Sequence, residues 1–163
     1  MPEKVVCNTS PLIFLSKINK LNLLETYNLY VPHQVEVEIS KGLKRHKEDA
    51  QQIIKYLGGK SVSRTKVALL KDLPAFLGPG ERAAISLAVK EGIAKVFIDE
   101  AKARRVARFK GLEPKGTLGI LWDAYKNRII DRKTTELLVF DLVQEGYRIK
   151  EDIFIEFLRK LKG

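Results

Sequence analysis

Four side chains that can ligate a metal ion stand beside the predicted strands and helices of this chain. Asn8 ends the first predicted strand, and Asp99 directly follows a later one. Glu81 lies in the first turn of a predicted helix, and Glu38 lies on the helix that follows the second strand. Carboxylates gathered in one place repel each other, and some would hold protons unless a cation lay between them. Mg²⁺ or Mn²⁺ suits such a set, and a metal held there can activate water and neutralise a phosphate oxygen, as phosphodiester hydrolysis requires.

Each of these residues also has a structural interpretation that the sequence leaves open. The helix dipole favours Glu81 at its position, and Glu38 is compatible with a solvated helix face. Asn8 and its neighbours are capping residue types, and Asp99 could cap the helix that follows it. On spacing alone, Asp99 is the strongest functional candidate because it follows a buried strand.

Short apolar strands alternate with helices along the chain, a pattern typical of a parallel sheet covered by helices on both faces. We expect strands over residues 5–7, 29–31, 61–64 and 95–98. We expect helices over 12–27, with a break near Asn19, and over 32–42, 48–57, 78–91, 101–110, 117–125, 133–145 and 151–161. In such sheets, functional groups gather at the carboxyl ends of the strands near a topological switch point. That rule points to Asn8 and Ser10 after the first strand, and to Asp99 and Glu100 after the last.

The chain of 163 residues carries 30 Lys and Arg against 20 Asp and Glu, which gives a net charge of +10. Residues 41–71 carry nine basic and two acidic residues, and residues 101–133 carry ten and three, so each segment has a net charge of +7. This balance favours a polyanionic partner, either a nucleic acid or an anionic membrane. A membrane is the weaker choice, because the basic segments lack the Trp-, Phe- and Leu-rich face of an interfacial helix.

The predicted helix over 101–110 begins beside Asp99 and is strongly basic. Its Val106 and Phe109 are expected to anchor the helix on the sheet and to leave the arginines near the mouth of the site. These arginines are Arg104, Arg105 and Arg108. Arginine matches the geometry of a phosphate better than lysine does. The three are therefore candidate phosphate-binding residues, although a solvated basic face explains them equally well.

The single cysteine, Cys7, excludes an intramolecular disulfide and a cysteine zinc site, and we expect it to be buried in the first strand. The N-terminus lacks the pattern of a signal peptide. The longest apolar stretch, residues 11–15, is far below the roughly 20 residues that span a bilayer. We therefore expect a soluble, cytoplasmic protein with no membrane partner.

Four sequence motifs resemble those of PIN-domain proteins, in the same order and with similar spacing. They are Val5–Ile13, Gly80–Ala88, Ile98–Glu100 with Ala103–Ala107, and Gly116–Leu121. Together they cover residues 4–125, and the C-terminal helices are similar to the tail of a prokaryotic subgroup. The resemblance implies a single PIN-like domain over residues 1–163, with a C-terminal helical extension over 133–161.

The resemblance implies an α/β protein, a three-layer α/β/α sandwich with a central parallel sheet of about five strands. It also implies an acidic pocket that binds Mg²⁺ or Mn²⁺ and a divalent-metal-dependent endoribonuclease activity on single-stranded RNA. Many family members are VapC-type toxins neutralised by a small antitoxin protein, and members commonly form homodimers. Carried over by position, Glu38, Glu81 and Asp99 would be catalytic and would hold the metal together with Asn8. Ser10 and Thr117 would be neighbours of the pocket on the same basis, and Glu100 is a further pocket neighbour. The arginines of the basic helix described above, Arg104, Arg105 and Arg108, are the candidate RNA-binding residues.

Two positions differ from the pattern that is usual in the family. Asn8 stands where an Asp is usual, and Thr117 stands where an Asp is often found. Asn8 offers a carbonyl oxygen but no charge, and fewer carboxylates weaken metal binding and the activation of water. The alternative hypothesis is therefore a catalytically degenerate PIN-fold module that binds RNA or a protein. A phosphoryl-accepting receiver or a phosphatase is a third hypothesis, but those chemistries need an Asp nucleophile at a strand end, where the first strand offers only Asn8.

Overall fold

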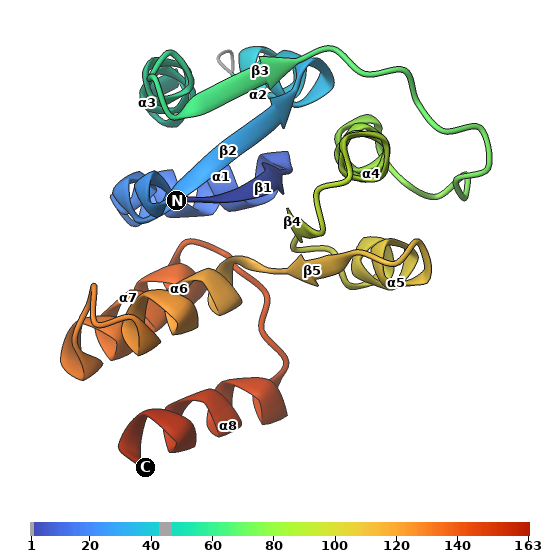
Figure 1. Ribbon diagram of the computed structural model, residues 1–163. Coiled ribbons are helices and arrows are strands. Elements are labelled where there is room, and N and C mark those ends of the chain that lie inside the picture. The colour runs from blue at the N-terminus through green and yellow to red at the C-terminus, as the bar shows by residue number, and fades with distance from the viewer. Residues whose placement is uncertain (1, 43–46) are drawn as a thin grey trace.

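The computed structural model describes residues 2–42 and 47–163, which are built around one five-stranded sheet (Figure 1). The strands are β1 (Glu3–Cys7), β2 (Tyr27–Pro32), β3 (Val62–Thr65), β4 (Lys95–Phe97) and β5 (Glu113–Lys115). They lie in the order β3-β2-β1-β4-β5, and every neighbouring pair is parallel. The expected α/β architecture is confirmed. Residues 43–46, which belong to the basic segment 41–71, lie outside the described residues.

Helices cover both faces of the sheet and form the outer layers of a three-layer sandwich (Figure 1). They are α1 (Thr9–Lys17), the 3-10 helix η1 (Leu21–Thr26), α2 (His33–Gly42), α3 (Lys47–Leu57), α4 (Pro79–Glu91), α5 (Ala101–Phe109), α6 (Thr117–Lys126), α7 (Arg132–Gln144) and α8 (Glu151–Lys162). Asn19, with a φ of 57°, separates α1 from η1, so the expected break is confirmed. Within the described ranges, no helix is both long enough and apolar enough to cross a membrane.

The sheet divides the hydrophobic core in two, because alternate residues of a strand point to opposite faces. Val5 and Cys7 of β1 pack with the side chains of α1, α3, α6 and α7, whereas Val6 packs with those of α4 and α5. In β4, Phe97 lies on the first face and Val96 on the second. Both faces are buried, which is why these strands are apolar without alternation. Cys7 is fully buried, as expected.

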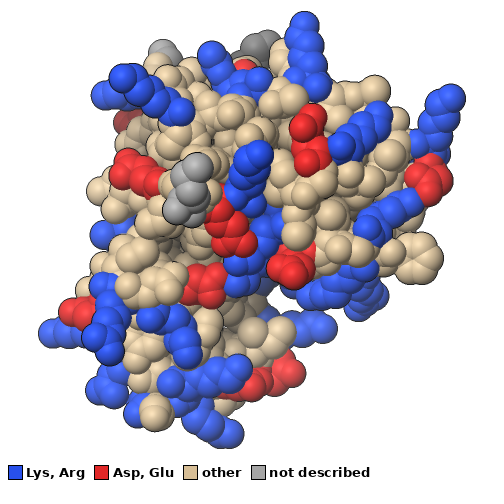
Figure 2. Space-filling view, in the orientation of Figure 1, with Lys and Arg blue, Asp and Glu red and all other residues tan. Residues whose placement is uncertain are grey.

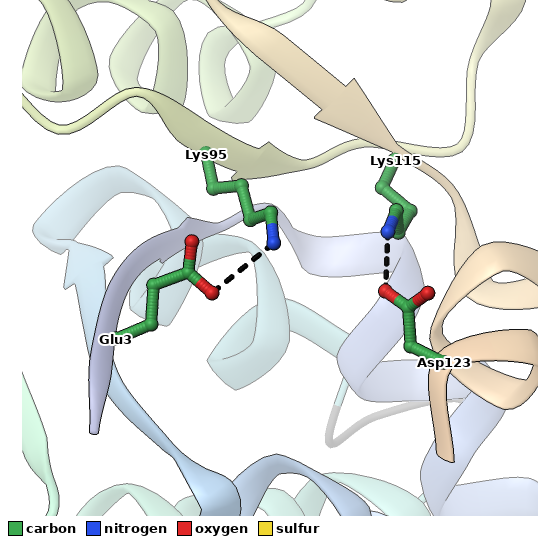
Figure 3. Close-up of polar contacts among 4 residues, drawn as sticks. All are labelled: Glu3, Lys95, Lys115 and Asp123. Carbon is green, nitrogen blue, oxygen red and sulfur yellow. Dashed lines mark hydrogen bonds and ion pairs between the residues drawn. The ribbon is translucent and has the colours of Figure 1, made fainter. Parts of the chain in front are cut away.

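The sequence does not predict β5, because this strand is short and contains Pro114. Proline has no N–H to donate to a sheet, but β5 is an edge strand that pairs only with β4. Ion pairs support this side of the sheet (Figure 3): Lys115 pairs with Asp123 of α6, and Lys95 Nζ lies 3.1 Å from Glu3 Oε2 of β1. The parallel order places β1 and β4 side by side at the centre, so their carboxyl ends meet at one edge.

Phe97→Ala tests the assigned core. The Phe97 ring is fully buried and packs edge-on against Tyr27, with 5.2 Å between ring centroids. We expect the free energy of unfolding to fall by about 3–5 kcal/mol, because the truncation leaves a cavity and loses apolar burial. Phe109→Ala is the control, since Phe109 is 89% exposed and its loss should change stability by less than about 0.5 kcal/mol. Equal urea denaturation midpoints for the two variants would contradict this core.

Candidate functional site

The side chain of Asn8 is buried at the carboxyl end of β1 and has an unpaired oxygen. Asn8 occupies the N-cap position of α1, yet its side chain makes no capping hydrogen bond. It is 5% exposed, and no donor among the described residues reaches its Oδ1. A buried amide oxygen without a partner costs about 1–3 kcal/mol. The capping interpretation of the Asn8 side chain is therefore wrong, and its oxygen has no partner among the described residues.

The side chain of Glu38, on α2, extends to the carboxyl end of β1 near Asn8. Its Oε1 accepts a hydrogen bond from the backbone N–H of Gly80 at 2.6 Å, and its Oε2 accepts one from Thr9 Oγ1 at 2.7 Å. Gly80 permits this approach, because a Cβ there would lie 2.6 Å from Glu38 Oε1 and 2.8 Å from Asn8 Oδ1. The helices α1, α2 and α4 therefore meet at Asn8 and Glu38, and Glu38 does not lie on a solvated helix face.

A pocket of about 280 Å³ opens where these three helices meet. It is lined by Asn8, Thr9, Ser10, Ile13, Phe14, Glu38, Gly78 and Glu81. Glu81 Oε1 accepts a hydrogen bond from the backbone N–H of Gly78 at 3.0 Å. Partial burial raises the pKa of the Glu81 carboxyl, the bond from Gly78 opposes that rise, and the negative charges of Glu100 and Glu38 add to it. The same negative charges would attract a cation into the pocket.

Four hydrogen bonds hold the Asp99 carboxylate and use both of its oxygens. Oδ1 accepts from the backbone N–H of Thr117 at 2.6 Å and from the Tyr147 hydroxyl at 2.7 Å. Oδ2 accepts from the hydroxyls of Ser10 and Thr117, each at 2.7 Å. Asp99 does not cap α5, because the N-cap residue is Glu100. Instead, Asp99 joins the end of β4 to the starts of α1 and α6.

Tyr147 is the residue at this cluster that the sequence does not reveal. It lies between α7 and α8, and its ring packs edge-on against Phe14 with 5.0 Å between ring centroids. Burial raises the pKa of its phenol, and the charge of Asp99 and the hydrogen bond to it raise the pKa further. The hydroxyl therefore stays protonated and remains a donor. The one sequence signal is a tyrosine after Gly146, whose φ of 93° turns the chain, and that signal is too common to identify a site.

The four predicted metal ligands form two neighbouring groups. Asn8, Glu38 and Glu81 line the pocket, whereas Asp99 lies in the hydrogen-bonded cluster, and Ser10 belongs to both. Over residues 2–42 and 47–163, the structure contains no group of three His, Cys, Asp or Glu that could hold a metal. The pocket does offer two carboxylates and an amide oxygen, a donor set that hard divalent cations accept. The unpaired oxygen of Asn8 is the observation that fits a cation here.

The three arginines of α5 differ in their surroundings. The Arg104 guanidinium donates to the backbone carbonyl of Asp99 and, at 3.4 Å, to that of Ile98. Arg104 is therefore engaged with the end of β4 instead of lying free near the site. Arg105 and Arg108 are exposed, as expected for residues that contact a phosphate.

The expectation that Phe109 anchors α5 on the sheet is wrong, because its side chain is 89% exposed. The helix packs through Ala103 and Ala107, which are fully buried, and Val106 lies partly buried against the same cluster. Phe109 follows Ala107 by two positions, and two positions correspond to about 200° around a helix. The side chain of Phe109 therefore points away from the sheet.

Comparison with known proteins identifies the class to which this fold and pocket belong. A family model described as DUF3368, PIN domain, matches residues 4–163. The chain therefore belongs to the PIN-domain family, a nuclease-type family whose members generally use divalent metal ions. Its fold is similar to that of a PilT N-terminus domain protein from the hyperthermophilic archaeon Sulfolobus solfataricus P2, with a TM-score of 0.52 and 14% identity over 74% of this chain and 92% of that one. A comparison with curated proteins finds no match.

Gly80→Ala tests the close approach of three helices at the pocket. The added methyl group would press on the oxygens of Glu38 and Asn8, and we expect the free energy of unfolding to fall by about 1–3 kcal/mol. Gly58→Ala is the control, because its Cβ would meet its nearest atom, the Lys55 carbonyl oxygen, at an ordinary 3.5 Å. Urea denaturation measures both variants. Equal stability in the two would show that Gly80 is not required for this packing.

Proposed function

We propose that this protein is a divalent-metal-dependent endoribonuclease that hydrolyses phosphodiester bonds of single-stranded RNA. The observation that carries the proposal is the buried, unpaired Oδ1 of Asn8, which shares one pocket with Glu38 and Glu81. Membership of a nuclease-type family supports the reaction class. The net charge of +10, concentrated in two segments, supports a polyanionic substrate.

In this proposal, Asn8, Glu38 and Glu81 supply the oxygens that hold Mg²⁺ or Mn²⁺. A cation bound there supplies positive charge beside a phosphate oxygen and a water of lowered pKa. Thr9 and Gly80 fix the direction of the Glu38 carboxylate by donating to both of its oxygens. Burial raises the pKa of the Glu81 carboxyl, and a cation held in the pocket would favour the ionised form of this group.

Asp99 has a positioning role in the arrangement described here. Its hydrogen bonds fix Ser10 at the wall of the pocket and fix the start of α6 through Thr117. Direct ligation of a metal by Asp99 requires that some of these donors leave it. Arg105 and Arg108 are the proposed phosphate contacts, because they are exposed on the helix that begins directly after Glu100.

A second candidate function is a PIN-fold module that binds RNA or a protein without cleaving it. Asn8 favours this alternative, since it brings no charge to the pocket. The four hydrogen bonds to Asp99 also favour this alternative, because they occupy both oxygens of the one predicted metal ligand that does not line the pocket. The same bonds count against a receiver or a phosphatase, because a nucleophilic carboxylate needs a free oxygen.

We further propose that the protein acts in the cytoplasm, as a VapC-type toxin with a small antitoxin partner, and as a homodimer. Large apolar side chains left exposed on α7 and α8 support an interface between copies. They are Leu137, Phe140, Val143, Ile153 and Ile155.

Leu137→Glu tests the homodimer. Leu137 is 56% exposed on α7, and a charge there would be buried without a partner in an interface between copies. We expect light scattering after size-exclusion chromatography to give a dimer for the wild type and a monomer for this variant. Ile54→Glu on α3, also at an exposed apolar residue, should remain dimeric. A monomeric wild type at micromolar concentration would refute the proposal.

Glu38→Gln tests the nuclease. The substitution preserves shape and removes one charge from the pocket, so we expect cleavage of labelled single-stranded RNA in Mg²⁺ or Mn²⁺ to fall by more than about 100-fold, since even residues behind metal ligands matter by about 10- to 100-fold. Glu36→Gln is the matched control on the same helix, because Glu36 pairs with Arg64 at 3.7 Å and does not line the pocket. EDTA should abolish cleavage by the wild type. Equal activity in the two variants would place the chemistry elsewhere.

Asn8→Asp distinguishes the two candidate functions, the nuclease and the module that binds without cleaving. The added charge should strengthen metal binding, measured by calorimetry, and should raise cleavage above that of the wild type. If the folded wild type is inert and Asn8→Asp cleaves RNA, the natural chain is the binding module. If neither cleaves RNA, the enzymatic proposal fails.

A further inference from the structure

Two phenylalanines are exposed on one side of the molecule, and the proposed reaction does not use either of them. Phe109, at the end of α5, is 89% exposed, and Phe76, in the connection before α4, is 59% exposed. A single exposed apolar side chain is common on a protein surface, but aromatic rings that share one face with basic residues form a surface that can contact a ligand. The residues around Phe76 and Phe109 indicate which kind of ligand this surface binds.

The connection that carries Phe76 runs along α5. Leu73 and Leu77 of this connection are buried in the same cluster as the α5 alanines. At one end of α5, Lys102 Nζ lies 6.0 Å from the centre of the Phe76 ring. At the other end, Lys110 forms an ion pair with Asp72. The connection and α5 therefore make one continuous surface, with Phe76 at the start of the helix.

Helix geometry places Phe109 on the same side as Phe76. Lys102 and Phe109 are seven residues apart, which is nearly two full turns, or about 10 Å along the axis. Their side chains therefore leave the helix in nearly the same direction. Arg105 lies between them, about 60° around the helix, and is exposed. Figure 2 shows Lys and Arg side chains over much of the visible face of the molecule, including the region of α5.

We propose that Phe76, Phe109 and the basic residues of α5 form a binding track for single-stranded RNA that leads to the pocket. Unpaired bases stack on the two rings, and Lys102, Arg105 and Arg108 contact the phosphates. The proposal rests on the proposed function for its substrate class. Stacking on exposed rings combined with a basic surface is how proteins bind single strands without reading sequence. A duplex keeps its bases stacked on each other and offers no free face to Phe76 or Phe109.

The track joins the pocket at its Phe76 end. Gly78, which lines the pocket, follows Phe76 by two residues, and α5 begins two residues after Asp99. An RNA chain whose bases stack on Phe76 is therefore directed toward Glu81 in the pocket. Phe109 contacts a part of the same RNA that lies farther from the pocket. The roughly 10 Å between the two ends of α5 corresponds to about three nucleotides at the 3.4 Å spacing of stacked bases.

The test is fluorescence anisotropy with a labelled 12-nucleotide single-stranded RNA in EDTA, where cleavage does not interfere. We expect Phe76→Ala and Phe109→Ala each to weaken binding by about 5- to 100-fold. Phe109→Leu should bind as weakly as Phe109→Ala, because leucine keeps apolar surface but has no aromatic face. Ile54→Ala, at an exposed apolar residue of α3, should bind as the wild type does. Circular dichroism confirms that each variant is folded.

Three further probes separate stacking from charge and from other ligands. An RNA with abasic positions should remove the difference between the wild type and Phe109→Ala, and a duplex of the same sequence should bind both equally. Arg105→Ala should reduce the slope of log K against log salt by about 0.7, whereas Phe109→Ala should leave that slope unchanged. Unchanged RNA affinity in both Phe76→Ala and Phe109→Ala would overturn the track. Because binding is measured without metal, an inactive enzyme with this binding pattern would refute the nuclease and keep the track.

Discussion

The Asp99 carboxylate is the acceptor at which four segments of the chain converge. Ser10 at the start of α1, Thr117 at the start of α6 and Tyr147 before α8 all donate to it at the end of β4. Hydroxyl and amide donors buried together need acceptors, and an ionised carboxylate supplies enough lone pairs for all of them. Without it, the Thr117 N–H and its hydroxyl would lose their partner in the interior. The wall of the pocket at Ser10 therefore depends on a carboxylate that does not itself line the pocket.

Much of this fold could be predicted because the central strands are buried on both faces. Burial on both faces requires short apolar runs such as Val5–Cys7, and these are visible in a single sequence. The strand β5 could not be found in this way, because an edge strand tolerates Pro114 and needs few apolar residues. Phe109 shows the other limit: its apolar character suggests burial, but the close packing of Ala103 and Ala107 determines which side of α5 faces the sheet.

The candidate site could be predicted only in part. The sequence shows which polar residues follow strands, and the structure does bring Asn8, Glu38 and Glu81 to one pocket. It does not show how many donors each carboxylate receives, because those donors come from distant segments. Tyr147 lies 48 residues from Asp99 along the chain, in a connection with no distinctive pattern. The resemblance to PIN-domain proteins supplied the pairing of distant motifs that spacing alone could not.

Tyr147 gives the outermost helices a thermodynamic link to the centre of the molecule. Its hydroxyl donates to Asp99 while its ring packs on Phe14, which also lines the pocket. A ligand that draws Asp99 away from Tyr147 would remove the hydrogen bond that holds the connection between α7 and α8 in place. The dependence runs both ways: a change in this connection that withdraws the Tyr147 hydroxyl leaves the Asp99 carboxylate with one donor fewer. The connection before α8 is therefore joined to the wall of the pocket through one hydroxyl and one ring.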